Sequence, residues 1–193
     1  MTMCGRYYVE AEDTEEELLA MLQTLNRRGL ACKTGEIFPT DTVAVIANSR
    51  ALQPTPFAMT WGYTLPGGKR LINARSESAA EKPMFREGML KRRCLIPASH
   101  YFEWTHDPRA RMKCAIRPEG AGLMYMAGLY RLEEGRPVFT ILTREPAPQI
   151  AFIHNRMPVI LPRDAAGAWL QLQTPAAEVL ARAEQNVVWG AVT

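Results

Sequence analysis

The 193-residue sequence lacks several patterns that would each assign it to a class of protein. Its four cysteines form no Cys-x-x-Cys pair, which excludes a zinc ribbon and a dithiol redox motif. No apolar run approaches the roughly 18 residues of a membrane-spanning helix, and the first residues lack the pattern of a signal peptide. The chain also has no internal repeats and no low-complexity tracts. We therefore expect a cytoplasmic protein with reduced thiols and no membrane partner.

The net charge of +3 hides an uneven distribution of charge along the chain. Residues 10–17 carry six acids and no base, whereas residues 69–113 carry eleven bases and five acids. A chain polarised in this way can present a basic face to nucleic acid. It can equally carry an ordinary solvated surface, and charge alone leaves both interpretations open.

The spacing of apolar residues predicts helices near the ends and strands between them. Thr14–Glu17 is typical of a capped helix start, and the apolar stripe that follows ends at Gly29. Thr174-Pro175 begins a last helix. The expected strands are Val43–Ala47, Phe57–Trp61, Cys94–Ile96, Tyr101–Trp104, Leu123–Leu129, Val138–Thr143, Pro158–Leu161 and Val187–Trp189. Because no βαβ rhythm recurs, we expect an α+β domain with a curved, mainly antiparallel, barrel-like sheet flanked by helices.

Four stretches each place a polar, potentially reactive side chain among apolar neighbours. Taken singly, each has an ordinary structural explanation: Asn73 can be a turn residue, Glu103 a partner for an arginine, and His154 a hydrogen-bonding spacer. Cys94 and Cys114 have the apolar neighbours of buried thiols. The four stretches are Met3–Tyr7, Leu71–Glu77, Cys94–Trp104 and Ile153–Val159.

Together the four stretches resemble the SRAP family, the SOS response-associated peptidase or abasic site processing proteins. Members begin with Cys-Gly-Arg after the initiator methionine. They share Asn-Ala-Arg-x-Glu, Cys-x-x-Pro-Ala leading to Glu-Trp, and His-x-Arg-Met-Pro segments. The matching segments here, in the same order, are Cys4–Arg6, Asn73–Glu77, Cys94–Trp104 and His154–Pro158. The resemblance implies a single SRAP-like domain over residues 4–193, with residues 1–3 as a leader that is absent or removed in the active form.

The resemblance implies a protein that senses abasic sites in single-stranded DNA and traps them covalently. The ring-opened abasic deoxyribose is an aldehyde, which an unprotonated amine can attack to form an imine. An α-amine, with a pKa of about 7.7–8.0, supplies far more free base at neutral pH than a lysine with a pKa near 10.4. If Cys4 is the first residue, its thiol can then close a five-membered thiazolidine ring. The family also implies autopeptidase and lyase-type activity.

The resemblance assigns supporting roles to further residues. Asn73 orients the amine or the opened sugar, Glu103 transfers a proton, and His154 assists opening of the sugar. Contacts to DNA are expected from phosphate-binding arginines and from a tryptophan that stacks on a neighbouring base. These DNA-binding residues are Arg6, Arg75, Arg156 and Trp61.

Two segments depart from the family pattern. Glu36–Thr40 stands where members carry Asn-x-Ala-Pro-Thr, and the segment Trp61–Gly68 lacks the second tryptophan that often follows.

Two other functions stay open at this point. One is a cysteine hydrolase that uses Cys4 with His154, and the other is a noncovalent module for single-stranded DNA. We expect no cofactor and no metal, because His100 and His106 have no familiar zinc spacing from the cysteines. We also expect a monomer whose partner is single-stranded DNA with abasic sites, and which joins the nucleoid during DNA damage.

Overall fold

The central sheet closes on itself in the computed structural model, which describes residues 5–10, 16–106 and 111–192. Its strands follow the order β13-β12-β4-β3-β8-β11-β14, and a further pairing between β11 and β12 completes a ring. The ring consists of β3 (Thr42–Asn48), β4 (Pro54–Trp61), β8 (Arg93–Ala98), β11 (Met124–Glu133) and β12 (Arg136–Arg144). The strands that extend it are β7 (Asn73–Arg75), β13 (Met157–Pro158) and β14 (Ile160–Leu161).

The pairing pattern confirms the expected barrel-like, mainly antiparallel sheet. Among the described strands, β12 pairs in parallel with β4 and β7, and the other pairings are antiparallel. The domain therefore belongs to the α+β class, as the absence of a repeated βαβ pattern in the sequence predicted.

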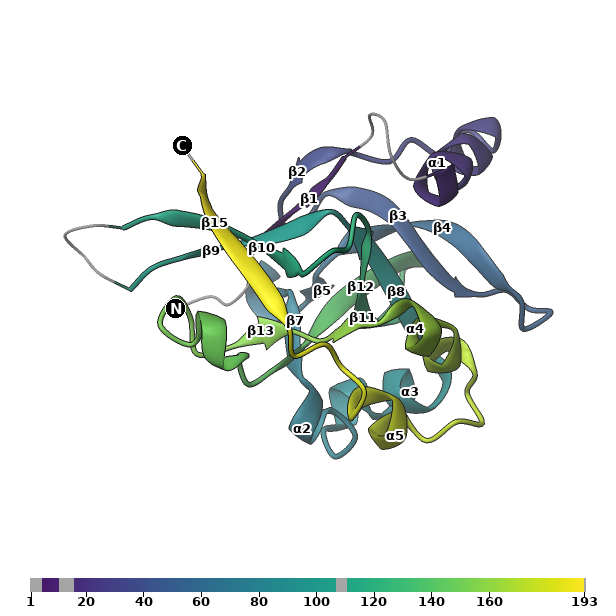
Figure 1. The fold of residues 1–193 in the computed structure, drawn as a ribbon. Helices are drawn as coiled ribbons and strands as arrows, with labels where there is room; N and C mark the ends of the chain where they lie inside the picture. Colours follow the sequence, from purple (N-terminus) through teal and green to yellow (C-terminus); the bar gives the residue numbers. More distant parts are fainter. Residues whose placement is uncertain (1–4, 11–15, 107–110, 193) are drawn as a thin grey trace.

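A second sheet lies beside the ring and carries the start of the described chain (Figure 1). Its order is β15-β10-β9-β1-β2, and every neighbouring pair is antiparallel. One face of β1 and β9 is buried through Tyr7 and Tyr101, whereas Tyr8 and His100 stand on the opposite face. The five strands are β1 (Arg6–Val9), β2 (Gly35–Ile37), β9 (His100–Trp104), β10 (Lys113–Pro118) and β15 (Val187–Val192).

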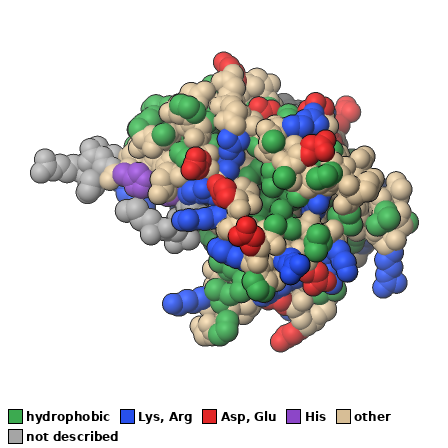
Figure 2. Space-filling model, turned by 90° about the horizontal axis from the view of Figure 1, so that it is seen from below, with side chains coloured by type: hydrophobic (Ala, Val, Ile, Leu, Met, Phe, Trp, Pro, Cys, Tyr) green, Lys and Arg blue, Asp and Glu red, His purple; other side chains and the backbone are tan. Residues whose placement is uncertain are grey.

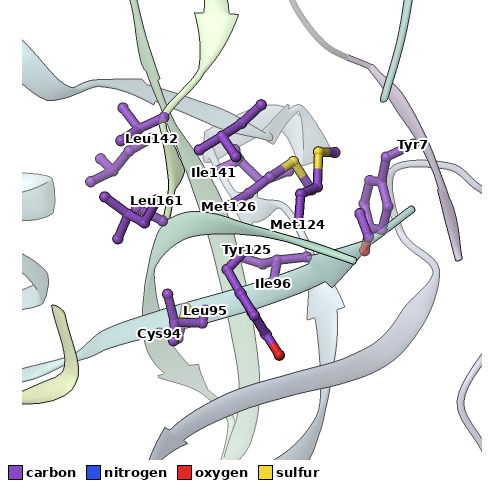
Figure 3. Packing of buried hydrophobic residues seen from close by; sticks show 14 of the residues in the cluster. Tyr7, Cys94, Leu95, Ile96, Met124, Tyr125, Met126, Ile141, Leu142 and Leu161 are labelled. Carbon is purple, nitrogen blue, oxygen red and sulfur yellow. The ribbon is translucent and has the colours of Figure 1, made fainter. Parts of the chain in front are cut away.

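Apolar side chains from both sheets form the core. In Figure 3 the side chains of Ile96, Met124 and Met126 lie within the ring, and Tyr7 reaches them from β1. Unbranched methionines suit this position because they fill irregular gaps between strands. Gly128 on β11 is required by close packing, since a Cβ there would meet the Ile96 side chain and lie 2.8 Å from the Thr140 carbonyl oxygen.

Helices cover the ring from different sides. The long helix α1 packs on β3 and β4 through Met21 and Leu25, away from the other helices (Figure 1). On α4, Trp169 is fully buried and its indole Nε1 donates to the Cys94 carbonyl oxygen at 3.0 Å. The helices are α1 (Glu16–Arg27), α2 (Ser76–Ala79), α3 (Pro83–Lys91), α4 (Arg163–Leu170) and α5 (Ala176–Leu180), with 3₁₀ turns at η1 (Pro66–Gly68) and η2 (Pro148–Ile150). A two-stranded ribbon pairs β5 (Tyr63–Thr64) with β6 (Arg70–Leu71).

Every strand expected from the sequence is present, although Pro158–Leu161 divides into β13 and β14. Apolar spacing did not predict β1, β10, α3 or α4. The first helix is present, but part of its expected cap at Thr14–Glu17 lies outside the described residues. Cys94 and Cys114 are buried as expected, and burial raises the pKa of the Cys94 thiol. Within the described residues, no helix is both long and apolar enough to cross a membrane.

The basic excess of residues 69–113 does not form one continuous patch on the face that carries α2 and α3. Figure 2 shows Lys and Arg side chains on this face interspersed with acidic and apolar ones. The total charge of a segment therefore does not locate a nucleic-acid surface here, and the site has to be found from individual contacts.

Candidate active site

Strand pairing brings the four chemically distinctive stretches together in two pairs. The first and third stretches are neighbours because Arg6 on β1 pairs with Phe102 on β9. The second and fourth stretches both border β12, where Thr143 pairs with Arg75 of β7 and with Pro158 of β13.

A bidentate ion pair joins the second stretch to the fourth. The guanidinium of Arg156 donates from Nη1 and Nη2 to the two carboxylate oxygens of Glu77, each at 2.7 Å. Nη2 also donates to the Thr143 carbonyl oxygen at 2.7 Å. Hydrogen bonds from Arg156 hold the pKa of Glu77 below its usual range. Arg156 is 9% exposed, so the pair fixes the loop before β13 against the β7–α2 junction.

His154 lies in that loop and is 6% exposed. Its Nδ1 lies 3.1 Å from the Arg156 backbone nitrogen and 3.3 Å from the Arg156 carbonyl oxygen, and the His154 backbone N–H donates to the Ile150 carbonyl oxygen at 3.3 Å. Burial lowers the pKa of His154, and the neighbouring His106 also lowers it, against the opposing effect of the backbone hydrogen bond. Burial and the His106 neighbour therefore favour the neutral imidazole.

A ring contact connects His154 to the third stretch. The rings of His106 and His154 stack with centroids 5.3 Å apart and an interplanar angle of 26°. His106 follows β9, three residues after Glu103. The end of β9 therefore lies close to the His154 loop, so the two pairs of stretches meet at one place.

Glu103 and Asn73 are both held at strand positions. Glu103 is 4% exposed on β9, opposite Cys114 of β10. Asn73 is half-buried on β7, opposite Ile141 of β12, and its Oδ1 atom is buried. Burying a carboxyl group to this extent costs free energy unless polar groups surround it. Buried carboxyl groups are common at catalytic sites, so Glu103 is a candidate for proton transfer.

The expected nucleophile, Cys4, lies outside the described residues. Gly5, to which it is bonded, is the first described residue and leads directly into β1. Since Arg6 pairs with Phe102, the chain enters β1 beside the part of β9 that carries Glu103.

Two of the expected DNA contacts need correction. Trp61 is fully buried, its Nε1 donates to the Ile72 carbonyl oxygen at 3.0 Å, and its ring stacks on Phe139 at a centroid distance of 6.3 Å. A ring with no exposed surface cannot stack on a DNA base, so Trp61 belongs to the core. Arg156 is likewise committed to Glu77 and Thr143 and is not an open phosphate clamp.

The other two arginines reach the surface. Arg75 is exposed where β7 ends and α2 begins. Arg6 has a side chain 39% exposed and lies 3.3 Å from Glu36. Both remain available to meet an anion.

Sequence reasoning missed two participants in this arrangement. Glu77 was part of the second stretch but had no assigned role, although its charge is opposite to that of Arg156. His106 was considered only as a metal ligand, and nothing in its spacing indicates a contact with His154. Among the residues that the structure describes, no group of three or more His, Cys, Asp or Glu side chains could hold a metal ion.

Comparison with known proteins gives consistent matches over most of the chain. "Abasic site processing protein YoqW" of Bacillus subtilis is 31% identical over 182 residues, which cover 87% of this chain and 80% of that protein. "Abasic site processing protein YobE" of the same organism is 31% identical over 182 residues, covering 87% and 82%. A crystal structure of a Bordetella bronchiseptica protein has the same fold, with a TM-score of 0.76, 22% identity and coverage of 98% and 100%.

The family model described as SOS response associated peptidase (SRAP) matches residues 3–193. This match includes all four stretches that meet around His154 and the end of β9, and the segments between them. The chain belongs to the SRAP family.

Proposed function

We propose that the protein recognises abasic sites in single-stranded DNA and links to them covalently through Cys4. The observation that carries the proposal is the stacking of His106 on His154, because His106 follows the strand that carries Glu103 and that strand pairs with β1 at Arg6. Two relatives that match this chain over most of its length are named abasic site processing proteins, which supports the same class of substrate.

The proposed reaction needs no oxidant or external cofactor. The α-amine of Cys4 adds to the aldehyde carbon of the opened sugar, and loss of water leaves an imine. The thiol then adds across the C=N bond: sulfur bonds to carbon, and the thiol proton passes to nitrogen. The product is a thiazolidine whose ring contains the α-nitrogen and the sulfur of Cys4. Placing amine and thiol on one residue favours closure because the second step is intramolecular.

Two buried groups can carry out the proton transfers that this reaction needs. His154 in its neutral form accepts a proton, and the Glu103 carboxyl group, 4% exposed, is a second group that can transfer one. In the proposal one of them removes the proton from the sugar's C1′ hydroxyl as the ring opens, and the other protonates the departing ring oxygen. Asn73 orients the amine or the opened sugar through its amide.

Arg75 and Arg6 supply the phosphate contacts that remain after the corrections above. Arg75 lies two residues beyond Asn73 and is exposed, so it can bind the phosphate next to a sugar held by Asn73. Arg156 contributes indirectly, because its backbone N–H and its ion pair with Glu77 hold the His154 loop.

The mechanism requires a free α-amine on Cys4. Residues 1–3 precede it in the sequence, and an amine within a peptide bond cannot form an imine. In the proposal Cys4 becomes the first residue, either because translation starts at Met3 and that methionine is removed, or because the site cleaves its own Met3–Cys4 bond.

A denaturing gel with a single-stranded oligonucleotide containing one abasic site tests the proposal. We expect a slower band that survives denaturation, is absent with intact DNA and disappears in Cys4→Ala. Cys4→Ser should give at most a labile product, because oxygen closes the ring less effectively. Intact-mass measurement should show that the linked protein begins at Cys4.

Each competing function predicts a different result. A noncovalent DNA-binding module gives no band after denaturation. A hydrolase based on the Cys4 thiol and His154 gives cleavage without an adduct. An adduct whose peptide map still joins Met3 to Cys4 would rule out the α-amine as nucleophile.

A further inference from the structure

A strip of aromatic and basic side chains lies on the outer face of the second sheet, away from the core. Residues alternate between the two faces of a strand, so Trp104 points away from the buried side of Glu103. Arg6 shares the outer face because its neighbour Tyr7 is buried. Phe38, just after β2, adds a ring that is 37% exposed. We call Phe38, Trp104 and the four cations around them (Arg6, Lys33, Arg111 and Lys113) the outer strip.

Cations contact both rings of the outer strip. The guanidinium carbon of Arg6 lies 4.6 Å from the Phe38 ring centroid and 4.9 Å from that of Trp104. Lys33 Nζ lies 4.9 Å from the Phe38 centroid, and the guanidinium carbon of Arg111 lies 5.7 Å from that of Trp104. Lys113 Nζ is 5.9 Å from the Trp104 centroid.

Within the part of the chain that the structure describes, acidic neighbours balance only part of this charge. Glu36 accepts from Arg6 at 3.3 Å and from Lys113 at 2.8 Å, and Asp41 pairs with Lys33. Among the described residues, two carboxylates thus stand beside the four cations Arg6, Lys33, Arg111 and Lys113. The remaining positive charge lies beside the exposed Phe38 ring and the half-buried Trp104 ring, a combination that suits a polymer of phosphates and flat bases.

Phe38 lies in one of the two segments that depart from the pattern expected of the family. It occupies the alanine position of Asn-x-Ala-Pro-Thr, where the chain has Glu36–Thr40. A phenylalanine exposes more apolar surface here than an alanine would, so the segment offers a ring on which a ligand can stack. The adjacent cations make a base of a nucleic acid a better match than a purely apolar partner.

We propose that Phe38 and Trp104 form a stacking platform for an unpaired base near the abasic site, with Arg111 binding the adjoining phosphate. This inference rests on the proposed function for the identity of the DNA strand. Trp104 directly follows Glu103 but faces the other side of the sheet, so the platform receives a flanking nucleotide and not the lesion. It provides the base stacking that the buried Trp61 cannot.

The test measures noncovalent binding to an intact single-stranded oligonucleotide by fluorescence anisotropy, and separately the yield of covalent adduct with an abasic one. Phe38→Ala and Trp104→Ala should each weaken binding roughly 5- to 100-fold, the loss typical of removing one aromatic–base stack. Phe38→Tyr should bind like the wild type. Leu90→Ala, which removes an apolar side chain 58% exposed on α3, is the control and should bind normally.

Salt dependence separates stacking from charge. Phe38→Ala should keep the wild-type slope of log affinity against log salt, because no cation is removed. Arg111→Ala should make the slope shallower by about 0.7, the value for one phosphate contact on single-stranded DNA. Thermal melting of each variant confirms that it is folded.

The outcomes distinguish this inference from the proposed function. If wild-type protein forms the adduct but folded Phe38→Ala and Trp104→Ala bind intact DNA as tightly as wild type, the platform is refuted and the covalent mechanism stands. If no adduct forms but both variants bind DNA more weakly than Leu90→Ala, the platform stands and the covalent mechanism fails. Equal weakening in Leu90→Ala also refutes the platform.

Discussion

The ion pair between Glu77 and Arg156 offers the sharpest test of how the His154 loop is held. Glu77→Gln removes the negative charge but keeps the shape and one acceptor oxygen. It leaves the Arg156 guanidinium, 9% exposed, with its bond to the Thr143 carbonyl oxygen. The change therefore weakens the partner of a nearly buried cation without creating a cavity.

The expected loss of stability depends on how far the Arg156 and Glu77 side chains are exposed to water. Breaking a fully buried ion pair costs about 3–5 kcal/mol, but the Glu77 side chain is 50% exposed, so water screens the pair and can replace the lost contacts. We expect a loss of about 1–2 kcal/mol in the free energy of unfolding. For a chain of this length that corresponds to a decrease of about 2–8 °C in Tm.

The pH dependence gives a second signature of the same pair. Arg156 holds the pKa of Glu77 below its unfolded value, so the folded state prefers the ionised carboxylate. The stabilisation is complete above the unfolded pKa of about 4.3 and is lost as pH falls through the folded pKa. The difference in unfolding free energy between wild type and Glu77→Gln should therefore be constant near pH 7 and shrink below about pH 4.

Chemical denaturation at several pH values measures this difference. Glu87→Gln is the control, because Glu87 is 63% exposed and lies 3.3 Å from Arg92 on the surface. Its effect should stay near zero. We also expect slower adduct formation in Glu77→Gln with little change in affinity for intact DNA, because the His154 loop loses its anchor. Equal stability of Glu77→Gln and Glu87→Gln at pH 7 would refute the reasoning.

Three further predictions concern single side chains. His106→Ala removes a neighbour that lowers the pKa of His154, so NMR titration of the His154 ring should show a higher pKa; an unchanged value would mean that the stacked ring has no electrostatic effect. Arg75→Ala should weaken binding to intact single strands and flatten its salt dependence by about 0.7, and an unchanged slope would assign Arg75 a role other than phosphate binding. Trp61→Ala should lower the free energy of unfolding by about 3–5 kcal/mol as a core residue, and a folded variant of wild-type stability would contradict the assignment of Trp61 to the core.

Local pattern in the sequence determined the type of most elements. Runs such as Val138–Thr143 are apolar and β-branched, so they form strands wherever the fold places them. The acids near Glu16 and the following apolar stripe determined the first helix in the same way. Short or polar elements were missed, among them β1 and β10, because their strand pairing and not their composition stabilises them.

The chemistry of the site was also readable from residue types. An amide at Asn73, a carboxyl at Glu103 and an imidazole at His154 indicate proton transfer and orientation in any fold that brings them together. The sequence by itself identified these groups and the family whose order they share.

The tertiary structure decided which groups are accessible and which are neighbours. Trp61 and Trp104 have the same chemistry, yet one is closed into the ring beside Phe139 while the other stands on the outer face with Arg6. Arg156 finds Glu77 only because β7 and β13 both border β12. Periodicity along a strand specifies which of its residues share a face. The residue that each one meets on the next strand depends on the register between segments far apart in the chain. That register is set by the closed sheet as a whole, so it could not be predicted from any one segment.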